Sequence, residues 1–375
     1  MYPSLYIHLP FCRRKCLYCD FYSSIYNEDI ASSYIAALIS QIDSLAYDRF
    51  YTIYIGGGTP SVLNAPLLER LLKSLQRYSA KCREFTFEAN PESLDEDKIK
   101  LLLGSGVTRL SIGVQSPDEQ KLKKLGRVHS ASRAREVVML SSKIGFKNIS
   151  IDLIFGVWGE DVLRWSRDVD EAVKLPVDHI SCYSLTYEKN TPLFEALKNK
   201  SIIPLEDDIT ADMYEFAIDR LALRGFKQYE ISNFAKAGYE CKHNLNYWEN
   251  NPYVGLGASA VSYIDGTRSK NISDTAEFLR RSGAGKPLIE SSEKLSSLKS
   301  AKETAAVKIR TKDGIDFDWF KEKTGYDFLK LERDAVRELM EKDLVKYKKI
   351  ENIPAGICLK RKGFLFCDTV SSVLL

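Results

Sequence analysis

The sequence predicts an α/β fold: a partial (β/α)6 barrel followed by a smaller C-terminal domain with helices and a β-wing. Two observations predict it. Strand-like and helix-like stretches alternate six times, about every 30 residues, and this regularity stops near residue 200 of the 375-residue chain. Alternation of this kind indicates parallel strands joined by right-handed helical crossovers. Because a closed barrel of this type has eight units, six units favour an open, partial barrel.

The expected strands are short apolar stretches, and a helical pattern follows most of them. "LYIHLP" at 5–10 and "YTIYI" at 51–55 come first, and each precedes apolar residues at helical spacing, over 28–46 and 66–78. The other expected strands are 84–90, 109–115, 148–156 and 178–185. The other expected helices are 95–103, stretches up to residue 144, and 161–174.

Residues beyond 200 have a different pattern. A helix is expected over 208–224, and 229–268 is rich in Gly, Asn and aromatic residues. The Ser- and Lys-rich segment 284–300 is expected to be a linker, so we predict a core over 1–270 and a C-terminal domain over 285–375. That domain is expected to contain helices at 302–309, 316–323 and 327–341, and to end in a β-wing formed by "LVKYKKI", "GICLKRKG" and "FLFCDTV".

Composition narrows the class of protein. A net charge of +3 is too small to predict nucleic-acid binding, and no apolar run reaches the length of a membrane span. No basic segment followed by an apolar stretch marks a signal peptide, so we expect a cytoplasmic protein. In that reducing compartment the eight cysteines are expected to be thiols or metal ligands rather than disulfides.

Three of these cysteines, Cys12, Cys16 and Cys19, lie within eight positions at the spacing C-x₃-C-x₂-C. Three thiolates can bind three irons of a cubane [4Fe–4S] cluster and leave the fourth iron open to a small molecule. Structural zinc would require four ligands, and the other nearby candidates, His8 and Cys82, lie at unsuitable spacings. Inert thiols are the third alternative. The spacing favours the open cluster.

Further polar or glycine-rich motifs lie at or near the expected strand ends, where ligands bind in parallel barrels. The candidates are Gly57, Gly58, Thr59, Glu88, Gln115, Arg127 and Asp152. The glycines of "GGGTPS" would let a ligand approach the main chain, although a tight strand-to-helix turn would also use them. A helix cap, a surface amide, a solvated cation and a salt bridge are the alternatives for the polar side chains. Their common position at one edge favours a single site.

With these motifs the chain resembles the radical S-adenosylmethionine (SAM) superfamily, in particular the branch of oxygen-independent coproporphyrinogen oxidases and HemW heme chaperones. The resemblance rests on the cysteine motif with Tyr18 before its last cysteine, on "GGGTP" and on "EANPE", and it extends from Tyr6 to about Val370. In that family the amino and carboxylate groups of SAM chelate the open iron. Reductive cleavage of SAM then yields a 5′-deoxyadenosyl radical.

The resemblance implies a role for each motif residue. Cys12, Cys16 and Cys19 would ligate the [4Fe–4S] cluster, and Tyr6 and Tyr18 would flank the cluster and SAM. The residues expected to contact SAM, at one site or at two, are Gly57, Gly58, Thr59, Glu88, Gln115, Arg127 and Asp152.

Within the branch, the resemblance favours the heme chaperones. The oxidases have an N-terminal extension and a further cysteine two residues after the third. Here only a short segment precedes Cys12, and Phe21 occupies the position of that further cysteine. "HNLNYW", beginning at His243, matches the H-N-x-x-Y-W motif associated with heme binding. His243 is therefore the expected heme ligand and Cys241 its rival, while a hydrogen-bonded core histidine is the alternative.

The expected function is that of a heme chaperone that binds heme and delivers it to hemoprotein acceptors. The alternatives are an oxygen-independent coproporphyrinogen III dehydrogenase, which would decarboxylate propionate side chains, and a radical SAM enzyme acting on an unrelated substrate. Whether the protein is an enzyme thus stays open. A homodimer and peripheral contact of the basic residues near 346–362 with a membrane or with heme propionates also stay open.

Overall fold

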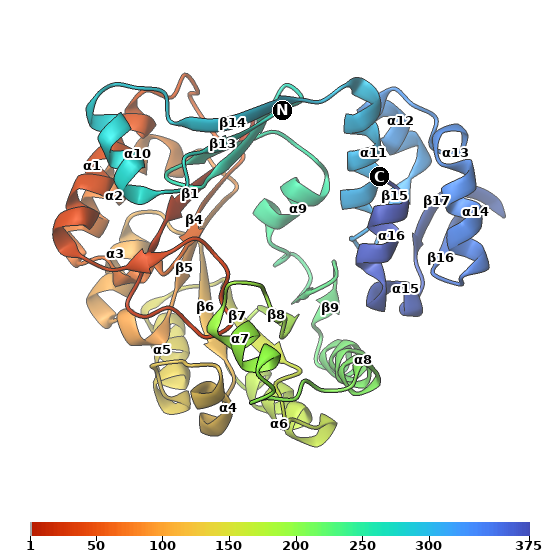
Figure 1. The fold of residues 1–375 in the computed structure, drawn as a ribbon, viewed down its shortest axis with the longest axis horizontal. Helices are drawn as coiled ribbons and strands as arrows, with labels where there is room; N and C mark the ends of the chain where they lie inside the picture. The colour runs from red at the N-terminus through yellow and green to blue at the C-terminus, as the bar shows by residue number, and fades with distance from the viewer. Residues whose placement is uncertain (1) are drawn as a thin grey trace.

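The computed structural model describes residues 2–375 and contains a large, mostly parallel sheet (Figure 1). Six strands lie side by side in sequence order, each parallel to the next. They are β1 (Ser4–Leu9), β4 (Thr52–Gly57), β5 (Glu84–Ala89), β6 (Arg109–Gln115), β7 (Ile149–Phe155) and β8 (His179–Ser184). The predicted α/β class and the six predicted strands are confirmed.

The helices between these strands lie outside the curve of the sheet (Figure 1). They are α1 (Glu28–Asp43), α2 (Ala65–Ser79), α3 (Glu96–Gly104), α4 (Glu119–Lys124), α5 (Ala131–Ile144) and α6 (Val162–Ala172). Helix α2 is typical: Leu68, Leu71, Leu72 and Leu75 recur at helical spacing and are buried. The side chain of Asn64 caps its first turn.

Further strands extend the sheet at both edges, giving twelve strands in all among the described residues, and all of them pair antiparallel except β11, which is parallel to β1. Next to β1 lies β11 (Tyr253–Leu256), followed by β12 (Val261–Ile264), β13 (Thr267–Asn271) and β14 (Ile289–Lys294). Next to β8 lie β10 (Asn233–Ala235) and β9 (Lys227–Gln228). The linker predicted over 284–300 is wrong, because this segment contains β14 and the start of a helix. Every residue of β14 is exposed, so no apolar pattern marks it, and pairing with β13 holds it in place.

Shorter elements complete the larger part of the molecule. A two-stranded ribbon of β2 (Phe11–Cys12) and β3 (Ser24–Ile25) frames the cysteine loop. Two single-turn helices, η1 (Pro60–Val62) and η2 (Pro91–Ser93), follow β4 and β5. The remaining helices are α7 (Pro192–Lys198), α8 (Asp207–Leu223), α9 (Lys242–Trp248) and α10 (Thr275–Gly283). Helix α9 lies inside the curve of the sheet, on the side away from α1–α6 (Figure 1).

The C-terminal part is a helical unit around a three-stranded sheet. Its helices are α11 (Ser297–Lys308), α12 (Phe317–Thr324), α13 (Phe328–Leu331), α14 (Arg333–Glu341), α15 (Arg361–Leu365) and α16 (Cys367–Val373). Its sheet has the order β15 (Ile315–Asp316), β17 (Ile353–Leu359), β16 (Val345–Ile350). The wing is therefore the β16–β17 hairpin. The strand predicted for "FLFCDTV" is wrong, because Cys367, Val370 and Leu374 recur at helical spacing and are buried.

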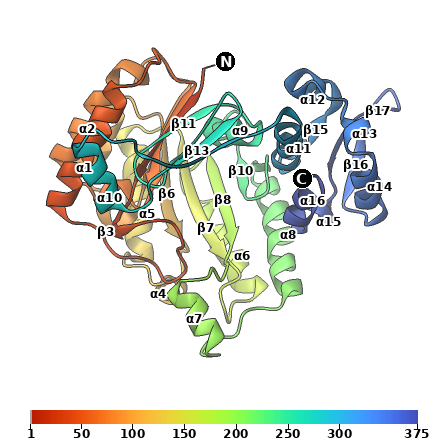
Figure 2. The ribbon, with the colours of Figure 1, turned by 45° about the horizontal axis from the view of Figure 1, so that its top comes forward.

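This C-terminal unit packs beside α8 and α9 (Figure 2). Arg361 pairs with Asp219 and Glu215 of α8 at 2.7 and 3.0 Å, and Asn250, just after α9, donates to Thr304 of α11 at 3.0 Å. Within residues 2–375, no helix combines the length and the apolar character that crossing a membrane requires.

Candidate functional site

The three clustered cysteines lie in one loop beyond the C-terminal end of β1. Cys12 is buried, Cys16 and Cys19 are partly exposed, and none forms a disulfide. Burial raises the pKa of Cys12, and it raises the pKa of Cys19 to about 11, with smaller contributions from the neighbouring Cys16 and Cys12 thiols. The Cys12 and Cys16 thiols therefore lie close enough to Cys19 to affect its ionisation.

The donor set fits a cubane cluster better than a single zinc ion. Among residues 2–375, no group of three or more His, Cys, Asp or Glu side chains converges on one metal position. In a cubane each thiolate binds a different iron, so the sulfurs need not converge on one point. His8 is not a spare zinc ligand, because its Nδ1 bonds to the Tyr6 hydroxyl at 2.9 Å and its Nε2 to the Tyr22 carbonyl at 3.1 Å. The Cys82 thiol donates to the Ser79 carbonyl instead.

The glycine-rich loop after β4 packs directly against the cysteine loop. The Gly58 N–H donates to the Leu9 carbonyl at 2.8 Å, and the Thr59 N–H donates to the Phe11 carbonyl at 2.7 Å. The Thr59 hydroxyl donates to the Cys12 sulfur at 3.5 Å. A Cβ atom on Gly58 would lie 2.6 Å from the Phe11 carbonyl oxygen and 3.0 Å from the Cys12 sulfur. The motif therefore supports Cys12 from one side, as well as closing a turn.

Replacing Gly58 with alanine should consequently displace the Cys12 sulfur. Because the contact with Phe11 involves backbone, no side-chain rotation relieves it. We expect Gly58→Ala to lower the iron bound after anaerobic reconstitution by at least about half, measured by iron and sulfide analysis. Gly283→Ala is the matched control, because nothing lies within 4 Å of a Cβ atom there. Full iron content in Gly58→Ala would contradict this role of the loop.

Glu88 lies at the end of β5 and faces the neighbouring strand β4. Its carboxylate accepts hydrogen bonds from the Tyr54 hydroxyl at 2.5 Å and from the Gly57 N–H at 3.2 Å. Burial raises the pKa of Glu88 to about 7, and the nearby Asp152 carboxylate adds to the increase. Burial also raises the pKa of Asp152. Two enclosed carboxyl groups of this kind favour a cationic ligand, which would lower both pKa values.

Arg127 joins the cysteine loop to strands β5 and β6. Its guanidinium donates to the Cys16 sulfur at 3.2 Å, to the Asn90 side-chain oxygen at 2.7 Å and to the Gly113 carbonyl at 3.3 Å. Asn90 in turn donates to the Thr59 hydroxyl at 2.9 Å. A positive charge beside a thiolate stabilises the ionised form that binds metal. Arg127 therefore contacts the site directly.

Gln115 ends β6 beside these residues. A Cβ atom on Gly113 would lie 2.8 Å from the Gln115 side-chain nitrogen and 2.6 Å from the Asn90 oxygen, so both amides lie over this glycine. Asn90 was not among the predicted site residues, although it lies in the "EANPE" motif. Its position immediately after a strand was the available signal.

The two tyrosines predicted beside the cluster are both enclosed. The Tyr6 hydroxyl bonds to His8 at 2.9 Å, and burial raises the pKa of that hydroxyl. Burial likewise raises the pKa of Tyr18, although the nearby Arg127 opposes the increase. Tyr18 thus lies beside Arg127 and the cysteines, whereas Tyr6 points from β1 toward His8.

His243 lies away from the cysteine loop, on α9 at the inner face of the sheet. Only 1% of its surface is exposed, and both ring nitrogens are hydrogen-bonded, Nδ1 to the Thr52 hydroxyl at 2.7 Å and Nε2 to the Tyr247 hydroxyl at 3.0 Å. Burial lowers the pKa of His243 to about 3, and Arg109 contributes, so the imidazole is neutral. In this conformation His243 is a hydrogen-bonded interior residue.

Glu84, at the start of β5, holds the beginning of α9 in place. Its carboxylate accepts from the N–H groups of Lys242 and His243 at 3.0 and 3.1 Å, and from the Cys241 thiol at 3.5 Å. Burial raises the pKa of Cys241 to about 12, so this thiol stays protonated. Glu84 and Thr52 were not predicted as site residues, because no local pattern distinguishes a polar residue that contacts a segment more than 150 positions away.

Comparisons with known proteins agree with this geometry. Residues 6–170 match the family model of the radical SAM superfamily. The chain is 38% identical over 345 residues to the heme chaperone HemW of Lactococcus lactis, covering 91% of this chain and 90% of that protein. It is 34% identical to the heme chaperone HemW of Bacillus subtilis, covering 99% of each chain. The solved structure of the Escherichia coli coproporphyrinogen III oxidase HemN, a radical SAM enzyme, superposes with a TM-score of 0.84 at 19% identity, over 100% of this chain and 90% of that one. This last similarity concerns the fold.

Proposed function

The chain belongs to the HemW heme chaperones of the radical SAM superfamily, and on this premise we propose that it binds heme and delivers it to hemoprotein acceptors. It carries a [4Fe–4S] cluster and SAM for this role. The observation that supports the cofactor set best is the enclosure of the cysteine loop by Thr59 and Arg127, each of which donates a hydrogen bond to a cysteine sulfur.

In this proposal Cys12, Cys16 and Cys19 would ligate three irons of the cluster, and the iron without a protein ligand would be open to SAM. Hydrogen bonds from Thr59 and Arg127 stabilise the thiolates, and hydrogen bonds to cluster sulfurs adjust the reduction potential. Gly57 and Gly58 offer main chain that a ligand can approach. Glu88 and Asp152 supply the negative charge that a bound ammonium or sulfonium group requires.

Heme binding by His243 requires a local rearrangement. The Nε2 atom must exchange the Tyr247 hydroxyl for iron, because it is already hydrogen-bonded. Rotation of Tyr247 or displacement of α9 would free it. The rival ligand Cys241 is less suitable, because a thiolate is the form that binds iron, and burial beside Glu84 keeps this thiol protonated.

Titration of heme into anaerobically reconstituted protein tests the proposal. We expect a Soret band with saturable binding, and at least about tenfold weaker binding in His243→Ala. His179→Ala is the matched control, because that imidazole is equally buried and bonds to Ser150 and Tyr229. If the protein decarboxylates coproporphyrinogen III and binds no heme, the chaperone proposal is wrong and the dehydrogenase alternative is correct.

Two further parts of the proposal concern location and partners. We propose the cytoplasm, and the eight free cysteines support it, because a reducing compartment keeps thiols unpaired. Membrane contact by the basic C-terminal residues has less support. Lys360 pairs with Asp343, and Arg361 pairs with Glu215 and Asp219, so part of that charge is neutralised within the chain. Homodimer formation stays an expectation.

A further inference from the structure

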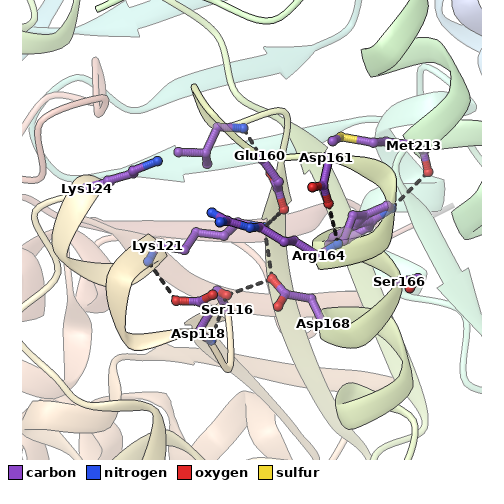
Figure 3. Close-up of polar contacts among 12 residues, drawn as sticks. Ser116, Asp118, Lys121, Lys124, Glu160, Asp161, Arg164, Ser166, Asp168 and Met213 are labelled. Atoms are coloured by element: carbon purple, nitrogen blue, oxygen red, sulfur yellow. Dashed lines mark hydrogen bonds and ion pairs between the residues drawn. The ribbon is translucent and has the colours of Figure 1, made fainter.

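A buried cluster of charged side chains lies outside the predicted site, between α4 and α6 (Figure 3). The Lys121 ammonium group pairs with Glu160 at 2.5 Å and with Asp168 at 2.9 Å. Each of these three side chains exposes at most 7% of its surface. Glu160 also accepts from the Val157 N–H at 3.0 Å, and Asp168 from the Ser116 hydroxyl at 2.6 Å.

Clusters of this kind are costly to bury, so stability alone is weak grounds for retaining one. Desolvation of two carboxylates and an ammonium group offsets much of their attraction, and apolar residues of similar volume often serve stability as well or better. Burial raises the pKa of both Glu160 and Asp168, and Lys121 opposes that increase. What such a cluster supplies is a fixed geometry, because every partner must stay in place.

One arm of the cluster holds the residue after Gln115. The Ser116 hydroxyl connects two aspartates: it donates to the Asp168 carboxylate and accepts from the Asp118 N–H at 2.9 Å. Gln115 has a φ of +66°, which is strained for a residue with a side chain. The pairing of β6 with β7 is also irregular between Ile112 and Gln115. Irregularities of this type redirect a side chain, and strained backbone persists only where its surroundings hold it.

The other arm holds Arg127 and the cysteine loop through α4. Lys121 anchors the middle of this short helix, and the Arg127 N–H donates to the Leu122 carbonyl at 2.9 Å. The Leu125 carbonyl accepts from the Leu17 N–H of the cysteine loop at 3.4 Å. A Cβ atom on Gly126 would lie 2.8 Å from the Leu17 side chain, so helix and loop are in close contact. A shift of α4 would therefore move both Arg127 and Cys16.

We infer that Lys121, Glu160 and Asp168 are positioning residues that fix Gln115 and Arg127 for SAM binding at the cluster. This inference rests on the SAM site of the proposed function and adds three residues that touch neither the cysteines nor the glycine-rich loop. The cluster acts on two parts of that site. Asp168 is bonded to Ser116, which is adjacent to Gln115, and Lys121 holds α4, which lies just before Arg127.

The experiment measures SAM binding to anaerobically reconstituted protein by equilibrium dialysis, together with iron content and the thermal unfolding midpoint. Asp168→Asn keeps the side-chain shape but removes the charge. We expect SAM to bind about tenfold more weakly at unchanged iron content. Asp170→Asn is the matched control, because it removes an ion pair with Arg220 from the same helix on the side facing α8. The control should bind SAM like the wild type.

Three further variants separate positioning from stability. Lys121→Arg keeps the positive charge and should retain more SAM affinity than Lys121→Met, and Glu160→Gln, which leaves the Lys121–Asp168 pair intact, should show a smaller loss than Asp168→Asn. SAM affinity that simply follows the unfolding midpoint across all variants, Asp170→Asn included, would overturn the inference. If the wild type binds SAM and Asp168→Asn binds it with the same affinity, this inference is overturned while the proposed function stands. A wild type that binds no SAM would overturn it together with the SAM part of the proposed function.

Discussion

Each of the single replacements Cys12→Ser, Cys16→Ser and Cys19→Ser should abolish the iron–sulfur cluster while the fold persists. A cubane with one open iron has only three protein ligands, so none is redundant. No neighbouring group is available to replace a lost thiolate, because the ring nitrogens of His8 are already hydrogen-bonded and Cys82, just after α2, donates to the Ser79 carbonyl. Anaerobic reconstitution followed by iron and sulfide analysis should show less than about a tenth of the wild-type content.

The fold should persist because main-chain bonds, rather than the thiols, define the loop. The Tyr26 N–H donates to the Cys12 carbonyl at 2.9 Å, and the Gly58 N–H donates to the Leu9 carbonyl at 2.8 Å. Far-ultraviolet circular dichroism should therefore be unchanged in all three variants. Cys182→Ser, which alters a buried cysteine of β8, serves as the control and should retain the cluster. If any one of the three single variants still binds iron in the wild-type amount, the cofactor assignment loses its basis.

The parallel core was predictable because its strands are short runs with buried apolar residues that recur along the chain between helical patterns. For β6 the predicted and observed bounds, 109–115, coincide, and all seven residues are buried. The residues at its rim were predictable for a related reason. The C-terminal ends of parallel strands converge, so Glu88, Gln115 and the glycine-rich loop had to lie near one another.

Contacts between distant segments were not predictable in the same way. Lys121 lies in the run "KLKK", where a lysine is ordinarily solvated, yet it is the one that turns inward to meet Glu160 and Asp168. Strand β14 is fully exposed and is defined by its neighbour rather than by its own pattern. His243 was recognised from its motif, but its burial depends on Thr52 of β4, which no local signal connects to it.

Glu84→Ala should destabilise the protein strongly, because this carboxylate joins β5 to the helix that carries His243. The side chain is only 2% exposed and accepts from two main-chain N–H groups of α9. It also lies near the buried Arg109. Burial lowers the pKa of Arg109, but its acidic neighbours, Glu84 among them, together raise it by more. Removal of Glu84 leaves these donors without their acceptor and takes a nearby negative charge away from the cation. We expect a decrease in the free energy of unfolding of about 3 kcal/mol, measured by urea denaturation.

Two controls locate this effect at α9. Glu84→Gln keeps an acceptor oxygen for one N–H and should lose less stability, whereas Glu96→Gln removes an exposed pair with Lys100 and should cause no measurable change. Hydrogen exchange should show faster exchange of the Lys242 and His243 amides in Glu84→Ala, because these are the groups that lose their acceptor. If those amides stay protected, another contact holds α9. Without Glu84, α9 should move away from the sheet more readily. If this displacement is what exposes His243, the folded Glu84→Ala protein should bind heme more tightly than the wild type.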